Sequence, residues 1–207
     1  MTIVIATNNE GKLAELRALL PEGVSLLTMS EAGLDSPVET GSTFVANALL
    51  KARHAATSGH VAVADDSGLE VDALHGAPGV RSARFAGPAA SDEDNNRLLL
   101  DRLTGVAVGR RGARFVSAVA LVSPTGREWT AAGTLSGVIA DRPRGSAGFG
   151  YDPVFQVQDP GAGDYNGRTL AELTPQEKNS VSHRARAWAA LAGCINEALR
   201  LHAGTEG

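Results

Sequence analysis

Two adjacent carboxylates, Asp65 and Asp66, lie directly after a short apolar run at residues 61–64 and before a Ser-Gly pair. The apolar run predicts a strand that enters a core and stops at the two charges. Neighbouring carboxylates repel each other, so a cation, a proton or solvent has to relieve the repulsion. The stretch therefore suits a site for a hard divalent metal ion, and it suits a polar turn between two strands equally well.

A polar turn near the N-terminus has the composition of a phosphate-binding turn. It runs from Thr7 to Lys12, between a strand predicted at residues 2–6 and an amphipathic helix predicted at residues 12–20. Such a turn presents backbone N–H groups and an ammonium group at a helix N-terminus. It is not a Walker A loop, because the first glycine of that motif is missing and Leu13 follows the lysine. An ordinary capped helix start explains the turn at least as well.

Glu39 is a candidate third carboxylate. It precedes a helix predicted at residues 44–57, which a Ser-Thr pair can cap and which has an apolar face at helical spacing. Because this helix leads into the strand with the two adjacent carboxylates, Glu39 can join them; a solvated loop carboxylate is the alternative. Asn47 and Lys51 lie one turn apart on the helix and predict first a polar helix face, with a functional use as the second interpretation.

Aromatic and cationic groups are concentrated further along the chain. Residues 141–152, DRPRGSAGFGYD, fit a loop that lays an aromatic ring over a flat ligand, or simply a long turn before a strand. A Thr-Pro-Gln-Glu stretch begins a short helix that carries Lys178. Ser182 caps the last helix, which leaves His183 and Arg184 in a first turn rich in N–H donors.

The remaining segments are interpreted as scaffold. They include two strands joined by a Ser-Pro-Thr-Gly turn as an antiparallel pair, and a helix with a capping-box start at Ser91. The pattern predicts strands at residues 24–27, 69–74, 113–122, 128–139 and 154–157, and helices at residues 91–103 and 183–202.

Composition excludes several classes of protein. The chain has 207 residues, of which 43% are hydrophobic and 20% charged, which fits one domain. No apolar run reaches the roughly 20 residues that span a bilayer, and no secretory signal is recognisable, so we expect a cytoplasmic protein without a membrane partner. A net charge of −4 argues against nucleic acid as a partner. Cys194 is the one cysteine and lies in an apolar stretch, which predicts a buried structural thiol.

Six ordered stretches resemble one known family. They are TNNEGK at 7–12, ETGSTFVANALLKA at 39–52, ADDSGLEVDAL at 64–74, GAPGVRSARFAG at 76–87, FGYDPVF at 149–155 and ELTPQEKNSVSHRARA at 172–187. With these motifs the chain resembles a bacterial member of the inosine triphosphate pyrophosphatase family, also called the dITP/XTP pyrophosphatase family. The resemblance extends from residue 7 to the last helix, and the ordered set of motifs makes it highly specific.

The resemblance implies both a fold and an activity. The implied fold is α/β, with a long mixed sheet and flanking helices that form two lobes around a central cleft in a single domain over residues 1–207, usually as a homodimer. The implied activity is Mg²⁺-dependent hydrolysis of purine nucleoside triphosphates such as ITP, dITP and XTP to the monophosphate and pyrophosphate. This reaction removes deaminated purines from the nucleotide pool.

Carried onto this sequence, the resemblance also assigns roles to residues. It makes Asp66 the general base and places Mg²⁺ on Glu39 and Asp66, with Asp65 adjacent. It assigns substrate contacts to Thr7, Asn8, Asn9, Glu10, Gly11, Lys12, Ser67, Phe149, Gly150, Tyr151, Asp152, Lys178, His183 and Arg184.

Two other functions compete with this interpretation. One is a Maf-type pyrophosphatase that acts on other nucleotides, and the stretches at 149–152 and 182–184 favour the first family over it. The other is a noncatalytic nucleotide-binding sensor. The carboxylate set argues against a sensor, because a domain that only binds needs no general base beside its metal ion.

Overall fold

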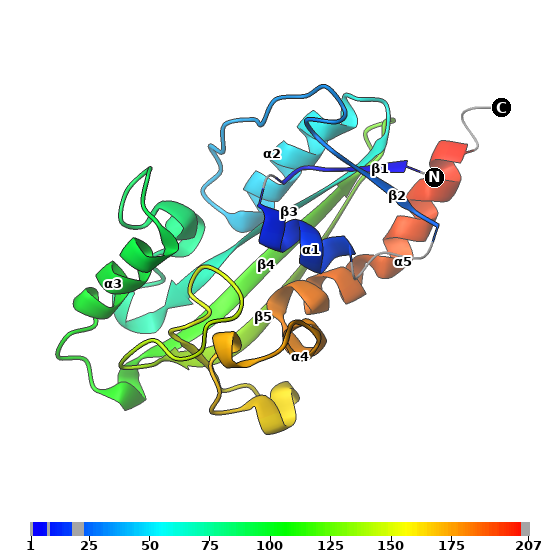
Figure 1. The fold of residues 1–207 in the computed structure, drawn as a ribbon. Coiled ribbons are helices and arrows are strands. Elements are labelled where there is room, and N and C mark those ends of the chain that lie inside the picture. The colour runs from blue at the N-terminus through cyan, green and yellow to red at the C-terminus, as the bar shows by residue number, and fades with distance from the viewer. Residues whose placement is uncertain (1, 8, 18–22, 204–207) are drawn as a thin grey trace. The chain divides into compact units, whose positions relative to one another are not determined.

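The computed structural model describes residues 2–7, 9–17 and 23–203, and Figure 1 labels its helices and strands. The strands are β1 (Thr2–Ile5), β2 (Ser25–Thr28), β3 (Val61–Val71), β4 (Gly112–Val122), β5 (Glu128–Ile139) and β6 (Phe155–Val157). The α-helices are α1 (Glu10–Arg17), α2 (Phe44–Ala56), α3 (Asp92–Arg102), α4 (Pro175–Val181) and α5 (His183–Ala203). The six strands form a sheet in the order β2-β1-β3-β4-β5-β6, parallel between β1 and its two neighbours and antiparallel between β5 and β6. The α/β fold with a mixed sheet is confirmed.

The chain divides into two compact units, each with its own hydrophobic core. Unit 1 contains Met1–Asp66, Ser117–Gly133 and Arg186–Gly207, and unit 2 contains Ser67–Val116 and Thr134–Ala185. The three long strands β3, β4 and β5 therefore each contribute residues to both units.

In unit 1 the strands present alternate side chains to two helical layers. Val61 and Val63 of β3 lie in the same register as Ile3 and Ile5 of β1 and join them in one hydrophobic cluster with α5. The residues between them point to the other face of the sheet, because side chains alternate along a strand. On that face α2 contacts β1 and buries Phe44, Ala48, Ala52 and Ala55.

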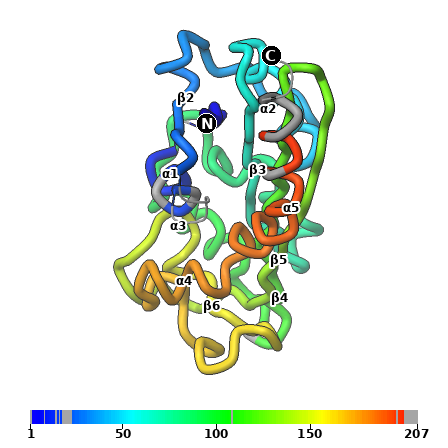
Figure 2. Tube along the Cα trace, turned by 90° about the vertical axis from the view of Figure 1, so that its right-hand side faces the viewer, coloured from blue at the N-terminus to red at the C-terminus, as the bar shows by residue number. Residues whose placement is uncertain are grey.

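In unit 2 the second halves of β3 and β5 and the first half of β4 pack with β6 and α3. Leu99 and Leu103 from the α3 region are fully buried beside Leu135 and Ile139 of β5. The capping box predicted at Ser91 is confirmed, as is the one at Thr174 that begins α4. Helix α4 passes into α5 through Ser182 alone (Figure 2), and the Ser182 hydroxyl accepts the Ala185 N–H as an N-cap.

Two predicted boundaries are wrong. The strand at residues 61–64 does not stop at Asp65 and Asp66, and no turn follows them: β3 runs unbroken to Val71, and a 3₁₀ helix at Asp72–Leu74 replaces the rest of the second strand. β1 pairs with β3 only over Val61–Val63, so pairing with β4, the neighbour on the other side, holds the polar residues extended against their turn propensity. Helix α1 begins at Glu10, before Lys12, and the predicted end at Leu20 lies outside the described residues.

None of the helices described at residues 9–17 and 23–203 is long and apolar enough to cross a membrane.

Gly137 of β5 offers a test of how tightly unit 2 is packed. It is paired with Val157, and a Cβ added there would lie 2.5 Å from Phe155 Cζ and also against the Gln156 carbonyl. Gly137→Ala should lower the free energy of unfolding by about 1–3 kcal/mol, because the fully buried Phe155 ring has no room to move. Gly109→Ala, where nothing lies within 4 Å, is the matched control. Urea unfolding that gave equal stabilities for the two variants would contradict this packing.

Candidate active site

Asp65 and Asp66 lie within β3 and point to opposite faces of the sheet. Asp65 continues the series of Val61 and Val63, whereas Asp66 continues the series of Ala62 and Ala64. Both residues are buried, with 1% and 7% of their surface exposed. Each face must therefore provide its own partners for a buried carboxylate.

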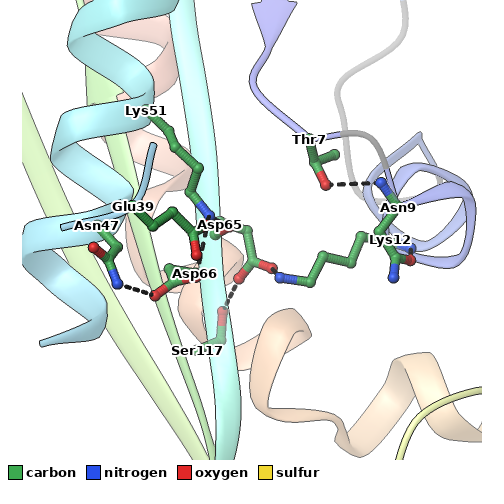
Figure 3. A network of polar contacts seen from close by, with 9 residues as sticks. All are labelled: Thr7, Asn9, Lys12, Glu39, Asn47, Lys51, Asp65, Asp66 and Ser117. Carbon is green, nitrogen blue, oxygen red and sulfur yellow. Dashed lines mark hydrogen bonds and ion pairs between the residues drawn. The ribbon is translucent and has the colours of Figure 1, made fainter. Parts of the chain in front are cut away.

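On the face covered by α2, Asp66 shares a cation with Glu39. The Lys51 ammonium group lies 3.1 Å from Asp66 Oδ1 and 2.7 Å from Glu39 Oε1, and it also donates to the backbone carbonyl of Asp65. Figure 3 shows Lys51 reaching down from α2 between these groups. The helix thus brings together two carboxylates that are far apart in the sequence.

Asn47 fixes the orientation of Asp66. Its Oδ1 accepts the N–H of Gly41 (2.7 Å), which leaves Nδ2 to donate to Asp66 Oδ2 (3.2 Å). A side chain at Gly41 would not fit, because its Cβ would lie 2.5 Å from Asn47 Oδ1. The Thr-Gly-Ser turn before α2 therefore positions the carboxylate through one buried amide.

Burial dominates the electrostatics of Asp66. Burial raises the pKa of its carboxyl group above the ordinary value, although the charges of Lys51 and Lys12 act to lower it. Burial acts to lower the pKa of Lys51, but the charges and hydrogen bonds of Asp66 and Glu39 outweigh it, so this pKa is raised. The ammonium group is thus held in its charged form between the two carboxylates.

On the opposite face, Asp65 binds Lys12. The Lys12 ammonium group lies 2.9 Å from Asp65 Oδ2, and the buried Ser117 hydroxyl of β4 donates to Oδ1 at 2.5 Å (Figure 3). Asn9 places Lys12 in the first turn of α1, since its Oδ1 accepts the Lys12 N–H at 2.9 Å. The turn from Thr7 to Lys12 is therefore a capped helix start that also delivers an ammonium group to β3.

Within the described segments, no group of three or more His, Cys, Asp or Glu side chains is gathered to hold a metal ion. The predicted trio is separated because Asp65 faces away from Glu39 and Asp66. The remaining pair suits magnesium: two carboxylates that converge on one ammonium group can converge on a hard cation, and Mg²⁺ takes one or two carboxylates with water and phosphate oxygens.

In unit 2 the predicted nucleotide residues form a second buried cluster around Phe149. The Lys178 ammonium group lies 4.4 Å from the centroid of the Phe149 ring, and the Arg184 guanidinium carbon lies 5.2 Å from it. Asp152 Oδ2 accepts both the Phe149 N–H (2.9 Å) and a bond from Lys178 (2.7 Å). His183, also buried, stacks on Phe115 with the ring centroids 4.7 Å apart. The cluster combines an aromatic face with cationic donors.

The other predicted residues lie outside these two clusters. Glu10 is exposed and Gly11 half-buried in the first turn of α1, Ser67 is half-buried on β3, and Asn8 lies outside the described residues. The Tyr151 hydroxyl donates to the Ser82 carbonyl (2.9 Å) inside unit 2, so this side chain supports the loop.

Sequence reasoning missed Ser117, which carries no local signal. The sequence favours a polar helix face for Lys51 and Asn47 and gives a functional use only as the second interpretation, although their spacing on the buried side of an alanine-rich helix is a signal that they contact Asp66.

Comparison with known proteins identifies the family. The profile of the Ham1 family matches residues 3–194. The chain belongs to the Ham1 family. It is 52% identical to a dITP/XTP pyrophosphatase of Methylococcus capsulatus, over 92% of this chain and 94% of that protein. The family resemblance expected from the motifs is confirmed.

Solved structures of Ham1 relatives share the fold. A HAM1 protein from Coxiella burnetii superposes with a TM-score of 0.84 at 42% identity, covering 95% of this chain and 99% of that one. A nucleoside-triphosphatase described as a dITP/XTP pyrophosphatase from Mycobacterium abscessus gives 0.74 at 50% identity, covering 92% and 98%.

In this Ham1 chain the buried ammonium group of Lys51 should contribute more to the free energy of unfolding than an exposed cation on the same helix. Lys51→Met should lower the free energy of unfolding by about 3 kcal/mol, because two partly buried carboxylates lose their shared ammonium group. Arg53→Met is the matched control two residues along α2, since the Arg53–Glu128 pair is mostly exposed and such pairs contribute less than about 1 kcal/mol. Urea unfolding in EDTA measures both, and equal losses would argue against a buried network.

Proposed function

We propose that this protein is a Mg²⁺-dependent dITP/XTP pyrophosphatase, which hydrolyses ITP, dITP and XTP to the monophosphate and pyrophosphate. The observation that carries the proposal is the convergence of the Glu39 and Asp66 carboxylates on the Lys51 ammonium group. The Lys12–Asp65 pair lies at the neighbouring position of β3. Relatives that share about half of the residues are named dITP/XTP pyrophosphatases. The Ham1 match over residues 3–194 also decides against a Maf-type enzyme.

In this proposal Asp66 is the general base. Its carboxylate takes a proton from the water that attacks the α-phosphorus, while the bond from that phosphorus to the bridging oxygen breaks and pyrophosphate leaves. Asn47 and Lys51 support the base by holding both of its oxygens in one orientation. Glu39 and Asp66 are the groups that would hold Mg²⁺, which when bound neutralises phosphate charge.

Lys12 and Asp65 have a different role from the metal ligands. The Lys12 ammonium group would face the negative charge that develops on the leaving pyrophosphate, and such charge is best stabilised by cations that are positioned in advance. Asp65 provides that positioning, since it pairs with the lysine on the opposite side of β3 to Asp66, and the Ser117 hydroxyl in turn holds Asp65. The stretch before Lys12 would add phosphate contacts from Thr7, Asn8, Asn9, Glu10 and Gly11.

The Phe149 cluster would recognise the base. The Phe149 ring would stack on the purine, and Lys178, His183 and Arg184 would donate towards the 6-keto oxygen of inosine and xanthosine. Adenine carries an amino donor at that position, so its binding would set donor against donor. Support comes from the buried cations over the Phe149 ring.

The nucleotide contacts assigned to Ser67, Gly150, Tyr151 and Asp152 stay predictions. The homodimer, the cytoplasmic location and the single two-lobed domain around a cleft stay predictions.

One assay tests the function itself. Products of ITP, XTP, dITP, ATP, GTP and dTTP are analysed with and without Mg²⁺, and pyrophosphate is expected from the first three when the metal is present. Release of inorganic phosphate instead of pyrophosphate would contradict the proposed cleavage at the α-phosphorus. Binding without any product would favour the noncatalytic sensor.

The two aspartates should differ in their effects. Asp66→Asn should reduce kcat for ITP by roughly 10²- to 10⁴-fold without unfolding the protein, and excess EDTA should abolish turnover in the wild type. Asp65→Asn should instead raise KM, since it releases Lys12, and leave the Mg²⁺ concentration for half-activation unchanged. If Asp65→Asn shifted the Mg²⁺ concentration for half-activation, Asp65 would have to be counted as a metal ligand.

Arg184 should control base choice. Arg184→Ala should lower kcat/KM for ITP and XTP towards the value for ATP, because a site built to donate to a substrate group rejects an analogue without it by roughly 10⁴-fold. Arg114→Ala, which removes an exposed arginine paired with Glu70, is the control. A uniform fall for ITP, XTP, GTP and ATP would assign Arg184 to the phosphates or to the fold.

A further inference from the structure

Helix α3 holds the peptide groups of Gly150 on both sides. The Gly150 N–H donates to Asp92 Oδ2 at 2.6 Å, and the Gly150 carbonyl accepts from Asn96 Nδ2 at 2.8 Å. Asp92 and Asn96 lie one helical turn apart, so they project from the same side of α3. No motif of the sequence pointed to this helix, which was interpreted as scaffold.

Gly150 lies at the centre of the loop that carries Phe149. Its backbone has a φ of +62°, and Gly148 before it has a φ of +79° with no room for a side chain beside the Asp152 carboxylate. These are left-handed conformations, which glycine adopts about as readily as others. The glycines alone therefore do not fix the orientation of the peptide groups around Phe149, and the hydrogen bonds to those groups do. Asp152 binds the Phe149 N–H from within the loop, whereas Asp92 and Asn96 bind the next residue from outside it.

Asp92 also lies close to the other aromatic residue of the loop. Burial, with a smaller contribution from the Asp92 charge, raises the pKa of Tyr151, which keeps its hydroxyl protonated as the donor to the Ser82 carbonyl. The loop is thus tied to α3 at Gly150 and to the segment at residues 79–84 through Tyr151.

The usual explanation for an acidic residue at this place is helix stability. Asp92, Glu93 and Asp94 all occupy the first turn of α3, where negative charge is favourable. Asp94 already forms the capping box with Ser91, and Asp92 and Glu93 are both exposed. Helix stability therefore does not explain the hydrogen bond from the Gly150 N–H to Asp92, which holds the loop against α3.

We infer that Asp92 and Asn96 are positioning residues for base recognition: by holding the Gly150 peptides, they set the Phe149 ring against Lys178 and Arg184. This inference rests on the proposed function, in which Phe149 stacks on the purine. Neither residue touches the reacting atoms, so their loss should act on base discrimination and KM more than on metal-dependent turnover.

Matched variants on α3 separate positioning from stability. Asp92→Ala is compared with Glu93→Ala, which removes a charge from the same turn, and Asn96→Ala with Asn95→Ala. Asn95 makes equivalent hydrogen bonds to a different segment, at Ala83 and Ala86. Asp92→Asn keeps an acceptor for the Gly150 N–H and serves as the conservative rescue.

The readouts are kcat and KM for ITP and ATP, the Mg²⁺ activation midpoint, the melting temperature, and amide exchange at Gly150. Asp92→Ala and Asn96→Ala should each raise KM for ITP and reduce the ITP/ATP preference by roughly 10-fold, the effect of one lost hydrogen bond that involves a charge or a buried amide. Exchange at Gly150 should accelerate and the metal midpoint should stay constant. Asp92→Asn should recover most of the preference, and the controls should keep it within about 2-fold.

The outcomes distinguish this inference from the proposed function. Phe149→Ala is measured alongside: if it keeps the wild-type preference for ITP, the proposed role of the loop is wrong, and the inference falls with it. If Phe149→Ala loses the preference while Asp92→Ala matches Glu93→Ala and Asn96→Ala matches Asn95→Ala, the positioning role alone is overturned. If Asp92→Ala or Asn96→Ala is too unstable to assay, the other variant and its matched control decide the question, judged by Gly150 exchange and the same preference.

Discussion

The repulsion between two neighbouring carboxylates buried in the middle of a strand constrains the structure around β3. An unpaired buried carboxylate would cost several kcal/mol, so a cation has to reach each one. Because Asp65 and Asp66 face opposite sides of the sheet, two different helices provide these cations: α1 brings Lys12 and α2 brings Lys51. Each of these two helices therefore places one lysine beside one of the aspartates.

Pairing of a lysine with a buried carboxylate occurs in both units. The sequence contains only three lysines, and all three pair with buried carboxylates: Lys12 with Asp65, Lys51 with Asp66 and Glu39, and Lys178 with Asp152. A lysine is a compact charge on a flexible stem, so it can enter a narrow buried position that a planar guanidinium group would not fit. Arginines form the exposed ion pairs, such as Arg53–Glu128 and Arg114–Glu70. Charges arranged in advance are what phosphate chemistry needs, since they require no reorganisation during the reaction.

Order in the loop at residues 148–152 comes from hydrogen bonds to its backbone. Two glycines with positive φ give the loop its path, but they do not select one conformation by themselves. Asp152 within the loop and Asp92 and Asn96 outside it make that selection. The loop therefore carries Phe149 in one conformation, fixed by hydrogen bonds to its backbone.

The sequence by itself determined the family and the starts of three helices. Caps at Ser91, Thr174 and Ser182 were predictable because they act within three residues, and the ordered motifs identified the family. Only the tertiary structure decided that β3 continues through Asp65 and Asp66, because their turn propensity is local whereas the sheet pairing that overrides it is not. Tertiary structure alone also separated Asp65 from the carboxylates of Glu39 and Asp66 and placed Ser117 and Asn96 beside their partners. Each of these two binds a group more than fifty residues away, and no spacing within the sequence encodes such a contact.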